Sequence, residues 1–220
     1  MLNALSAGLF GFLLGIKHAT DADHVVAVTA IVARERSFAR AARIGALWGL
    51  GHSLTVIVIG GALVAFRIAV PPRLGLALEF GVALMLIGLG YANLRAADAP
   101  GDAEAAPARS RDDARPLIVG VVHGLAGSAA VALLVLAAIP NPLLAFAYLI
   151  VFGFGTVAGM TVVTWMIAAP AALAAHRVRK FQRGLRLAAG GLSVILGLVL
   201  ARAIVVDGGL FRSTPSWSPR

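Results

Sequence analysis

Apolar residues run through most of this chain in long stretches that short polar segments separate. A helix needs about 20 consecutive apolar residues to cross the hydrocarbon core of a bilayer. By that measure the sequence predicts about six membrane-spanning helices, at residues 3–33, 42–66, 74–94, 116–139, 143–169 and 185–206. The expected fold class is therefore all-α, in the form of a polytopic integral membrane protein.

The first of these stretches carries polar residues at its centre. The motif HATDADH, residues 18–24, follows GLFGFLLGIK and precedes VVAVTAIVA. As a helix, the stretch after the motif would rise only about 14 Å, which is too short to cross a membrane alone. We therefore expect a single span with the polar motif at membrane depth.

Composition supports a membrane protein and limits the chemistry. Of the 220 residues, 60% are hydrophobic and 13% are charged, whereas soluble domains have about 45–50% apolar and about 25% charged residues. The mean hydropathy is +0.90. The chain has no cysteine, which excludes zinc–thiolate sites and iron–sulfur clusters. Any metal must be held by His, Asp, Glu or backbone oxygen atoms.

The net charge of +9 is explained by the loops and does not indicate nucleic-acid binding. Lys and Arg concentrate in the first, third and fifth loops, whereas the second and fourth loops and the tail hold only Arg67, Arg73, Arg212 and Arg220. Basic loops stay on the cytoplasmic side of a membrane. We therefore predict a protein of the cytoplasmic (inner) membrane with loops one, three and five in the cytoplasm and both termini outside.

The third loop divides the single membrane domain, residues 1–220, into two parts. Its composition, rich in Ala, Pro, Asp and Arg, predicts a flexible cytoplasmic linker at residues 95–115. Three spans precede it in residues 1–94, three follow in residues 116–206, and a tail occupies residues 207–220. Because three is odd, the two parts would run in opposite senses, as in inverted-repeat transporters, whose site lies near the midplane.

The aspartates of the motif need partners inside the membrane. An aspartate at the centre of a spanning helix costs about 2.5–3.5 kcal/mol. On a continuous helix, His18, Asp21 and His24 would share one face, and Asp23 would point to a different neighbour. The sequence thus predicts a polar site that several helices build together.

Two further histidines lie at comparable depth in other spans. His52 in the second span and His123 in the fourth lie about 10–15 Å from the cytoplasmic ends of their helices, as His24 does. Three of the five histidines have glycine three positions before them, at Gly15, Gly49 and Gly120. Small residues let helix backbones approach closely, so we expect these helices to meet in one layer. Trp48 is expected to serve in packing.

The predicted metal-binding residues are drawn from the first, second and fourth spans. They are His18, Asp21, Asp23, His24, His52 and His123. Glu79, near the outer end of the third span, could line an entrance or pair with Arg73. Imidazole and carboxylate ligands suit divalent cobalt, nickel, copper and zinc.

A permease fits these features better than an enzyme does. The sequence has no H-E-x-x-H motif, no nucleotide-binding G-x-x-x-x-G-K-[ST] motif and no exposed domain larger than a loop. A divalent metal ion would then be the transported substrate, the lipid bilayer the surroundings, and no resident cofactor is expected. A dication entering a cell with about 100 mV across its membrane gains about 4.6 kcal/mol, so uptake needs no ATP. The alternatives are proton-coupled export and an intramembrane metalloenzyme.

Three stretches of this chain resemble the nickel/cobalt transporter (NiCoT) family and its shorter relatives associated with urease and hydrogenase maturation. They are HATDADH with His18, Asp23 and His24, then LGHSLTV with His52, and HGLAGSAAVALLVL with His123. The resemblance implies permeation of Ni²⁺ or Co²⁺, with the His and Asp residues of the first stretch recognising the metal. Longer members have eight spans with this signature in the second, so the chain would lack their first helix.

The resemblance also poses a geometric problem for the first span. It marks His18, Asp23 and His24, which cannot all face one point from a regular helix. Either the helix is unwound at the motif, as in many transporters, or Asp23 holds a neighbouring ligand without contacting the metal itself.

Overall fold

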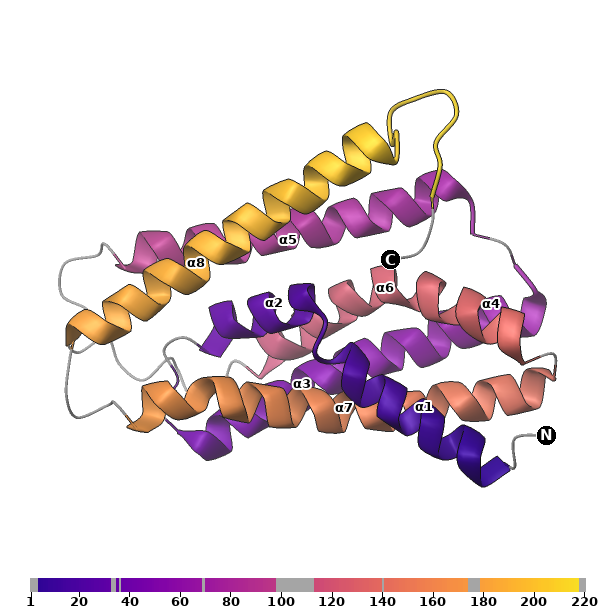
Figure 1. Cartoon of the computed structure of the whole chain (residues 1–220), viewed down its shortest axis with the longest axis horizontal. Coiled ribbons are helices and arrows are strands. Elements are labelled where there is room, and N and C mark those ends of the chain that lie inside the picture. The colour runs from indigo at the N-terminus through magenta and orange to yellow at the C-terminus, as the bar shows by residue number, and fades with distance from the viewer. Residues whose placement is uncertain are drawn as a thin grey trace.

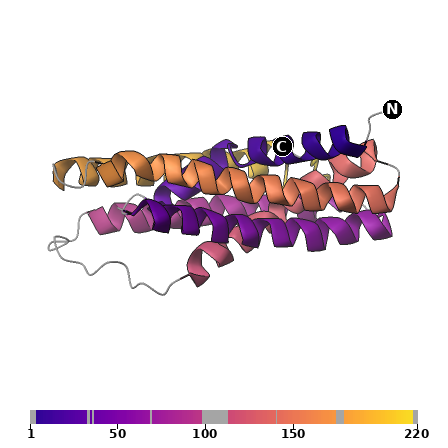
Figure 2. The same ribbon diagram turned by 90° about the horizontal axis from the view of Figure 1, so that it is seen from below.

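The computed structural model describes residues 4–32, 35, 37–68, 70–97, 113–139, 141–173 and 179–217. All regular structure in these ranges is helical, which confirms the all-α class. The helices run roughly along one common axis (Figures 1 and 2). Most of the predicted linker, residues 98–112, lies outside the described residues.

Each predicted span corresponds to one helix or to a short series of helices. In chain order the elements are α1 (Ala4–His18), α2 (Ala22–Val32), α3 (Phe38–Thr55), η1 (Val56–Gly60), α4 (Gly61–Phe66), α5 (Pro72–Ala97), α6 (Ala114–Ala138), α7 (Pro142–Leu173), α8 (Arg179–Arg202) and η2 (Ala203–Asp207). The elements η1 and η2 are single turns of π-helix that continue their neighbours.

Among the residues that the structure describes, four helical segments are long and apolar enough to cross a membrane. They are Phe38–Phe66, Pro72–Arg95, Pro142–Ala169 and Arg183–Asp207. The first predicted span is represented by two shorter apolar helices, and the fourth by the apolar segment Ala114–Ala126. The structure thus supports a membrane protein with four such helices, and the crossings by the first and fourth spans stay predictions.

The first span is interrupted at the motif, as one of the two alternatives for this span requires. Helix α1 ends at His18, and α2 begins at Ala22. Between them the Asp21 amide donates to the His18 carbonyl at 3.1 Å, and the Thr20 hydroxyl donates to the Lys17 carbonyl at 2.6 Å. Short polar side chains such as Thr and Asp compete in this way with the regular helical ladder. The face on which a continuous helix would place His18, Asp21 and His24 therefore does not exist.

The helices pack as a larger group, formed by α1, α3, α6 and α7, and a pair, formed by α5 and α8. Helix α3 contacts both α6 and α7, α1 lies on α7, and α5 packs along α8. Helix α2 lies between the group and the α5–α8 pair (Figure 1). The buried side chain of Asn93 on α5 holds α2 in this position, because its amide donates a hydrogen bond to the Ala30 carbonyl of α2 at 2.6 Å. The helix break thus lies close to the centre of the molecule.

Glycines bring the helix backbones into direct contact. A Cβ atom at Gly15 of α1 would overlap the Phe152 carbonyl oxygen of α7, and one at Gly120 of α6 would overlap the Trp48 carbonyl oxygen of α3. At Gly49 it would lie 2.8 Å from the Cα atom of α7 residue Val157. All three glycines that precede histidines are therefore at close helix contacts, as expected from their spacing.

Two adjacent glycines of α8 test this packing. A Cβ atom at Gly190 would lie 2.9 Å from the Gly90 carbonyl oxygen, whereas one at Gly191 would have no atom within 4 Å. We expect Gly190→Leu to separate α5 from α8 and to lower the free energy of unfolding by about 1–3 kcal/mol. The matched control, Gly191→Leu, should leave stability unchanged or raise it through better helix propensity. Thermal unfolding of the two purified variants in detergent compares them, and equal midpoints would contradict the packing.

Candidate metal centre

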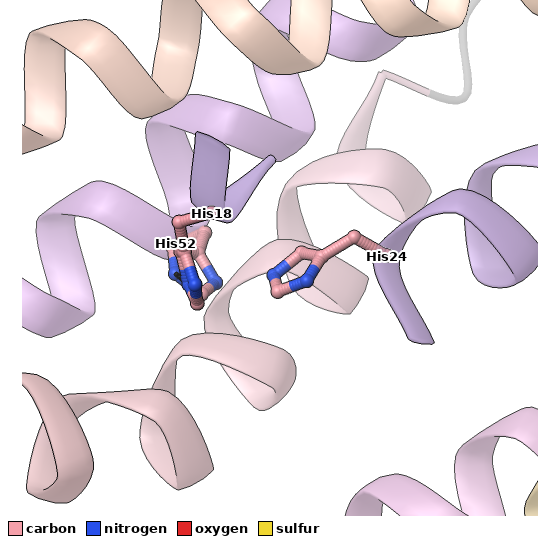
Figure 3. A group of neighbouring side chains, drawn as sticks. All are labelled: His18, His24 and His52. Atoms are coloured by element: carbon pink, nitrogen blue, oxygen red, sulfur yellow. Dashed lines mark hydrogen bonds between the residues drawn. The ribbon is translucent and has the colours of Figure 1, made fainter. Parts of the chain in front are cut away.

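Four histidines from four helices converge at the break in the first span. His18 is the last residue of α1, His24 lies in the first turn of α2, His52 is on α3 and His123 is on α6. The ring of His24 points toward those of His18 and His52 (Figure 3). Its centroid lies 4.6 Å from that of His18 and 4.2 Å from that of His123. His24, His52 and His123 are buried.

Three of these imidazoles form one possible ligand set. One ring nitrogen from each of His18, His24 and His52 can be chosen so that all lie within 4.8 Å of one another. The Nε2 atoms of His18 and His52 are 3.2 Å apart. The break is what permits this arrangement, because it lets the end of α1 and the start of α2 bring their side chains to the same point.

A second possible ligand set shares His24 with the first. Asp23, His24 and His123 also offer ligand atoms within 4.8 Å of one another. An oxygen of Asp23, Oδ2, lies 2.9 Å from Nε2 of His123, and the other, Oδ1, lies 3.2 Å from Nδ1 of His24. Both structural alternatives posed by the first span are therefore present together: the helix is interrupted, and Asp23 contacts a neighbouring histidine.

Asp21 lies at the edge of the cluster. Its Oδ2 atom is 2.8 Å from Nδ1 of His18, and its side chain is 45% exposed. It therefore contacts the side of the His18 ring opposite to the nitrogen that faces His52. A carboxylate in this position fixes the orientation of an imidazole ligand and increases its basicity.

Several ring nitrogens of the cluster have no hydrogen-bond partner among the described residues. They are the Nε2 atom of His24 and the Nδ1 atoms of His52 and His123, whereas Nδ1 of His24 has the 3.2 Å contact with Asp23. Leaving a buried polar atom unpaired costs about 1–3 kcal/mol, and such atoms in a folded protein call for an explanation. A ring nitrogen that carries no proton keeps a lone pair that can bind a metal ion, and this supplies one explanation.

Trp48 packs against two of these histidines. It is fully buried, its ring lies nearly parallel to that of His24 at a centroid distance of 6.0 Å, and His123 meets it edge-on at 5.9 Å. The sequence assigned Trp48 to packing and missed its contact with the cluster. The available signal was its position four residues before His52, which puts both on one helix face.

Glu79 lies apart from the cluster and binds the C-terminal tail. Trp217 donates its indole N–H to Oε1 of Glu79 at 2.8 Å. The guanidinium of Arg73 does not pair with Glu79 but donates to the backbone carbonyls of Arg212 and Ser213, at 3.1 and 3.4 Å. The role of Glu79 at an entrance stays a prediction.

Comparison with known proteins adds one relative. A protein named urease accessory protein UreH, from Bacillus sp. (strain TB-90), is 29% identical over 222 residues, which span 96% of this chain and 97% of that protein. No family model matches the chain, and no solved structure does. The relative's name describes an accessory protein and not an enzyme, in agreement with the absence of enzyme motifs from the sequence. This chain is therefore similar, over nearly its whole length, to a urease accessory protein.

Proposed function

We propose that this protein is a permease that carries Ni²⁺, or the chemically similar Co²⁺, across the cytoplasmic membrane into the cell. The observation that carries the proposal is the cluster of His18, His24, His52, His123 and Asp23, three of whose histidines are buried, in a protein with helices long and apolar enough to span a bilayer. Ionisable residues inside a membrane protein are costly and typically mark an ion pathway.

The chemistry of the cluster favours a transition-metal dication over Mg²⁺ or Ca²⁺. Neutral imidazole nitrogens suit nickel, cobalt, copper and zinc, whereas the alkaline-earth ions prefer sites made of oxygen. The carboxylates of Asp21 and Asp23 lie within 3.2 Å of histidine nitrogens, where they offset the charge of a dication. His18 and His24 therefore act as ligands, together with His52 and His123.

The similarity to a urease accessory protein favours nickel among these metals. Urease is a nickel enzyme, so a protein that assists it is expected to handle that ion. The three motifs that resemble the nickel/cobalt transporter family contribute all four histidines of the cluster. We infer that the chain is a short member of that family.

The arrangement of the helices supports an orientation and a direction. The helix ends that border the basic loops one, three and five lie toward the same end of the molecule (Figure 1). If that end faces the cytoplasm, as the positive-inside rule requires, the membrane potential draws dications inward. Proton-coupled export is the second candidate, and no feature of the cluster favours it over uptake.

The helix pairing supports six spans in two inverted halves. Helix α1 packs on α7 as α6 packs on α3, while α3 contacts α7 and α5 contacts α8. Each of the first three spans can be exchanged with its counterpart among the last three, that is α1 with α6, α3 with α7 and α5 with α8. The exchange turns this set of helix pairs into itself. Such symmetry suits alternating access, in which two halves of opposite orientation rock around a central site.

Uptake assays with single histidine variants test the transport site. We expect His52→Ala to lower the accumulation of radioactive Ni²⁺ at nanomolar concentration by about tenfold or more, because even residues that only orient ligands have effects of about 10–100-fold. The control is His176→Ala, which removes the one histidine that the sequence places in a loop. Immunoblots of the membrane fraction verify equal amounts of protein.

The same assay separates uptake from export. Normal accumulation in the His52→Ala variant would contradict a transport role for the cluster. Accumulation above that of cells carrying the unmodified protein would instead identify an exporter, since loss of export retains metal in the cell.

Asp21 offers a test of how His18 is held. Replacement by Asn keeps the size of the side chain and removes its charge, so the 2.8 Å contact with Nδ1 of His18 weakens. We expect Asp21→Asn to raise the Ni²⁺ concentration needed for half-maximal uptake by about 10–100-fold, with the maximal rate less affected. Asp207→Asn, on η2, is the matched control, and equal half-saturation in the two variants would exclude the positioning role.

A further inference from the structure

We propose that the cluster holds the metal ion at two successive stations that share His24, and that one ion passes from the first station to the second during each transport cycle. The first station consists of His18, His24 and His52, and the second consists of Asp23, His24 and His123. This inference rests on the proposed transport function and specifies how its site works.

The geometry gives two ligand sets and a single residue common to both. Each set brings its ligand atoms within 4.8 Å of one another, and His24 belongs to each. The ring of His24 lies 4.6 Å from that of His18 on one side and 4.2 Å from that of His123 on the other. His24 makes one close polar contact, from Nδ1 to Oδ1 of Asp23 at 3.2 Å, which belongs to the second set, and its Nε2 atom has no hydrogen-bond partner among the described residues.

Sharing His24 limits the cluster to one ion at a time. A neutral imidazole offers one nitrogen lone pair, because its other nitrogen carries the proton. Two dications this close would also repel each other four times as strongly as two single charges at the same distance. An ion at one station therefore excludes an ion from the other, and movement between the stations exchanges His18 and His52 for Asp23 and His123 while His24 stays bound.

The two stations are related by the exchange of halves that preserves the helix pairing. His18 is the last residue of α1, and Gly15, three residues before it, lies against α7. In the same way, His123 lies on α6, and Gly120, three residues before it, lies against α3. The exchange of halves that preserves the helix pairing maps His18 onto His123.

Carboxylates complete this correspondence. Asp21 contacts His18 at 2.8 Å, and Asp23 contacts His123 at 2.9 Å. Asp21 thus lies beside His18 of the first station, and Asp23 lies beside both His24 and His123 of the second. Each station therefore has a carboxylate that attracts a cation, and the two stations share His24.

Binding and transport measured on the same variants test the two stations. His52→Gln disables the first station, His123→Gln the second, and His24→Gln both, and glutamine preserves much of the side-chain volume. Equilibrium dialysis of radioactive Ni²⁺ against the full-length protein in detergent gives the number of ions bound, and uptake into proteoliposomes gives transport. Gel filtration and thermal unfolding verify that each variant is folded, and His176→Gln is the control.

We expect the unmodified protein and the two single-station variants each to bind one Ni²⁺ per chain. Both single-station variants should lose uptake, and His24→Gln should bind at least about tenfold more weakly than either. Two ions bound to the unmodified protein would overturn the inference. Retained uptake in either single-station variant, or loss of binding in both to the level of His24→Gln, would also overturn it.

These outcomes are distinct from failure of the proposed function. If the unmodified protein transports Ni²⁺ but the variants do not separate binding from transport, the cluster is a single site and only the two-station inference fails. If the unmodified protein neither binds nor transports Ni²⁺, both fail together.

Discussion

The site depends on one local event, the interruption of the first span between His18 and Ala22. A continuous helix would separate the directions of His18, Asp23 and His24 by its regular turn of about 100° per residue. With the helix broken, His18 projects from the end of α1 and His24 from the start of α2, so both rings reach one point. The bonds of Thr20 and Asp21 to nearby carbonyls satisfy part of the backbone that the break exposes.

The break needs tightly packed helices around it, and the glycines provide them. Contacts of α1 with α7 and of α6 with α3 occur at backbone distance because Gly15 and Gly120 have no side chain. His18 and His123 follow three residues after these glycines, so close packing delivers both histidines to the same layer. Trp48 fills the space behind His24 and His123 and limits the orientations available to their rings.

The helices and the depth of the histidines could be predicted from local sequence features, whereas the remaining features depend on tertiary contacts. Hydrophobic length gives the helices, and depth along each helix gives the layer of His24, His52 and His123. The motif poses the break but does not decide it, because short polar side chains such as those of Thr20 and Asp21 are compatible with a helix and with a turn, and tertiary contacts override local propensity. The partners of Asp23 and of Glu79 lie about 100 or more positions away in sequence, and no local pattern identifies them.

A buried cluster of imidazoles with unpaired nitrogens and carboxylates at its edges is suited to take a dication out of water. The most direct measurement is the nickel X-ray absorption spectrum of the purified full-length protein loaded with one equivalent of Ni²⁺. The account predicts the multiple-scattering pattern of several imidazole ligands, which should diminish in the His24→Gln variant. A spectrum of oxygen ligands alone, like that of hydrated Ni²⁺, would contradict the assignment of these histidines to the metal.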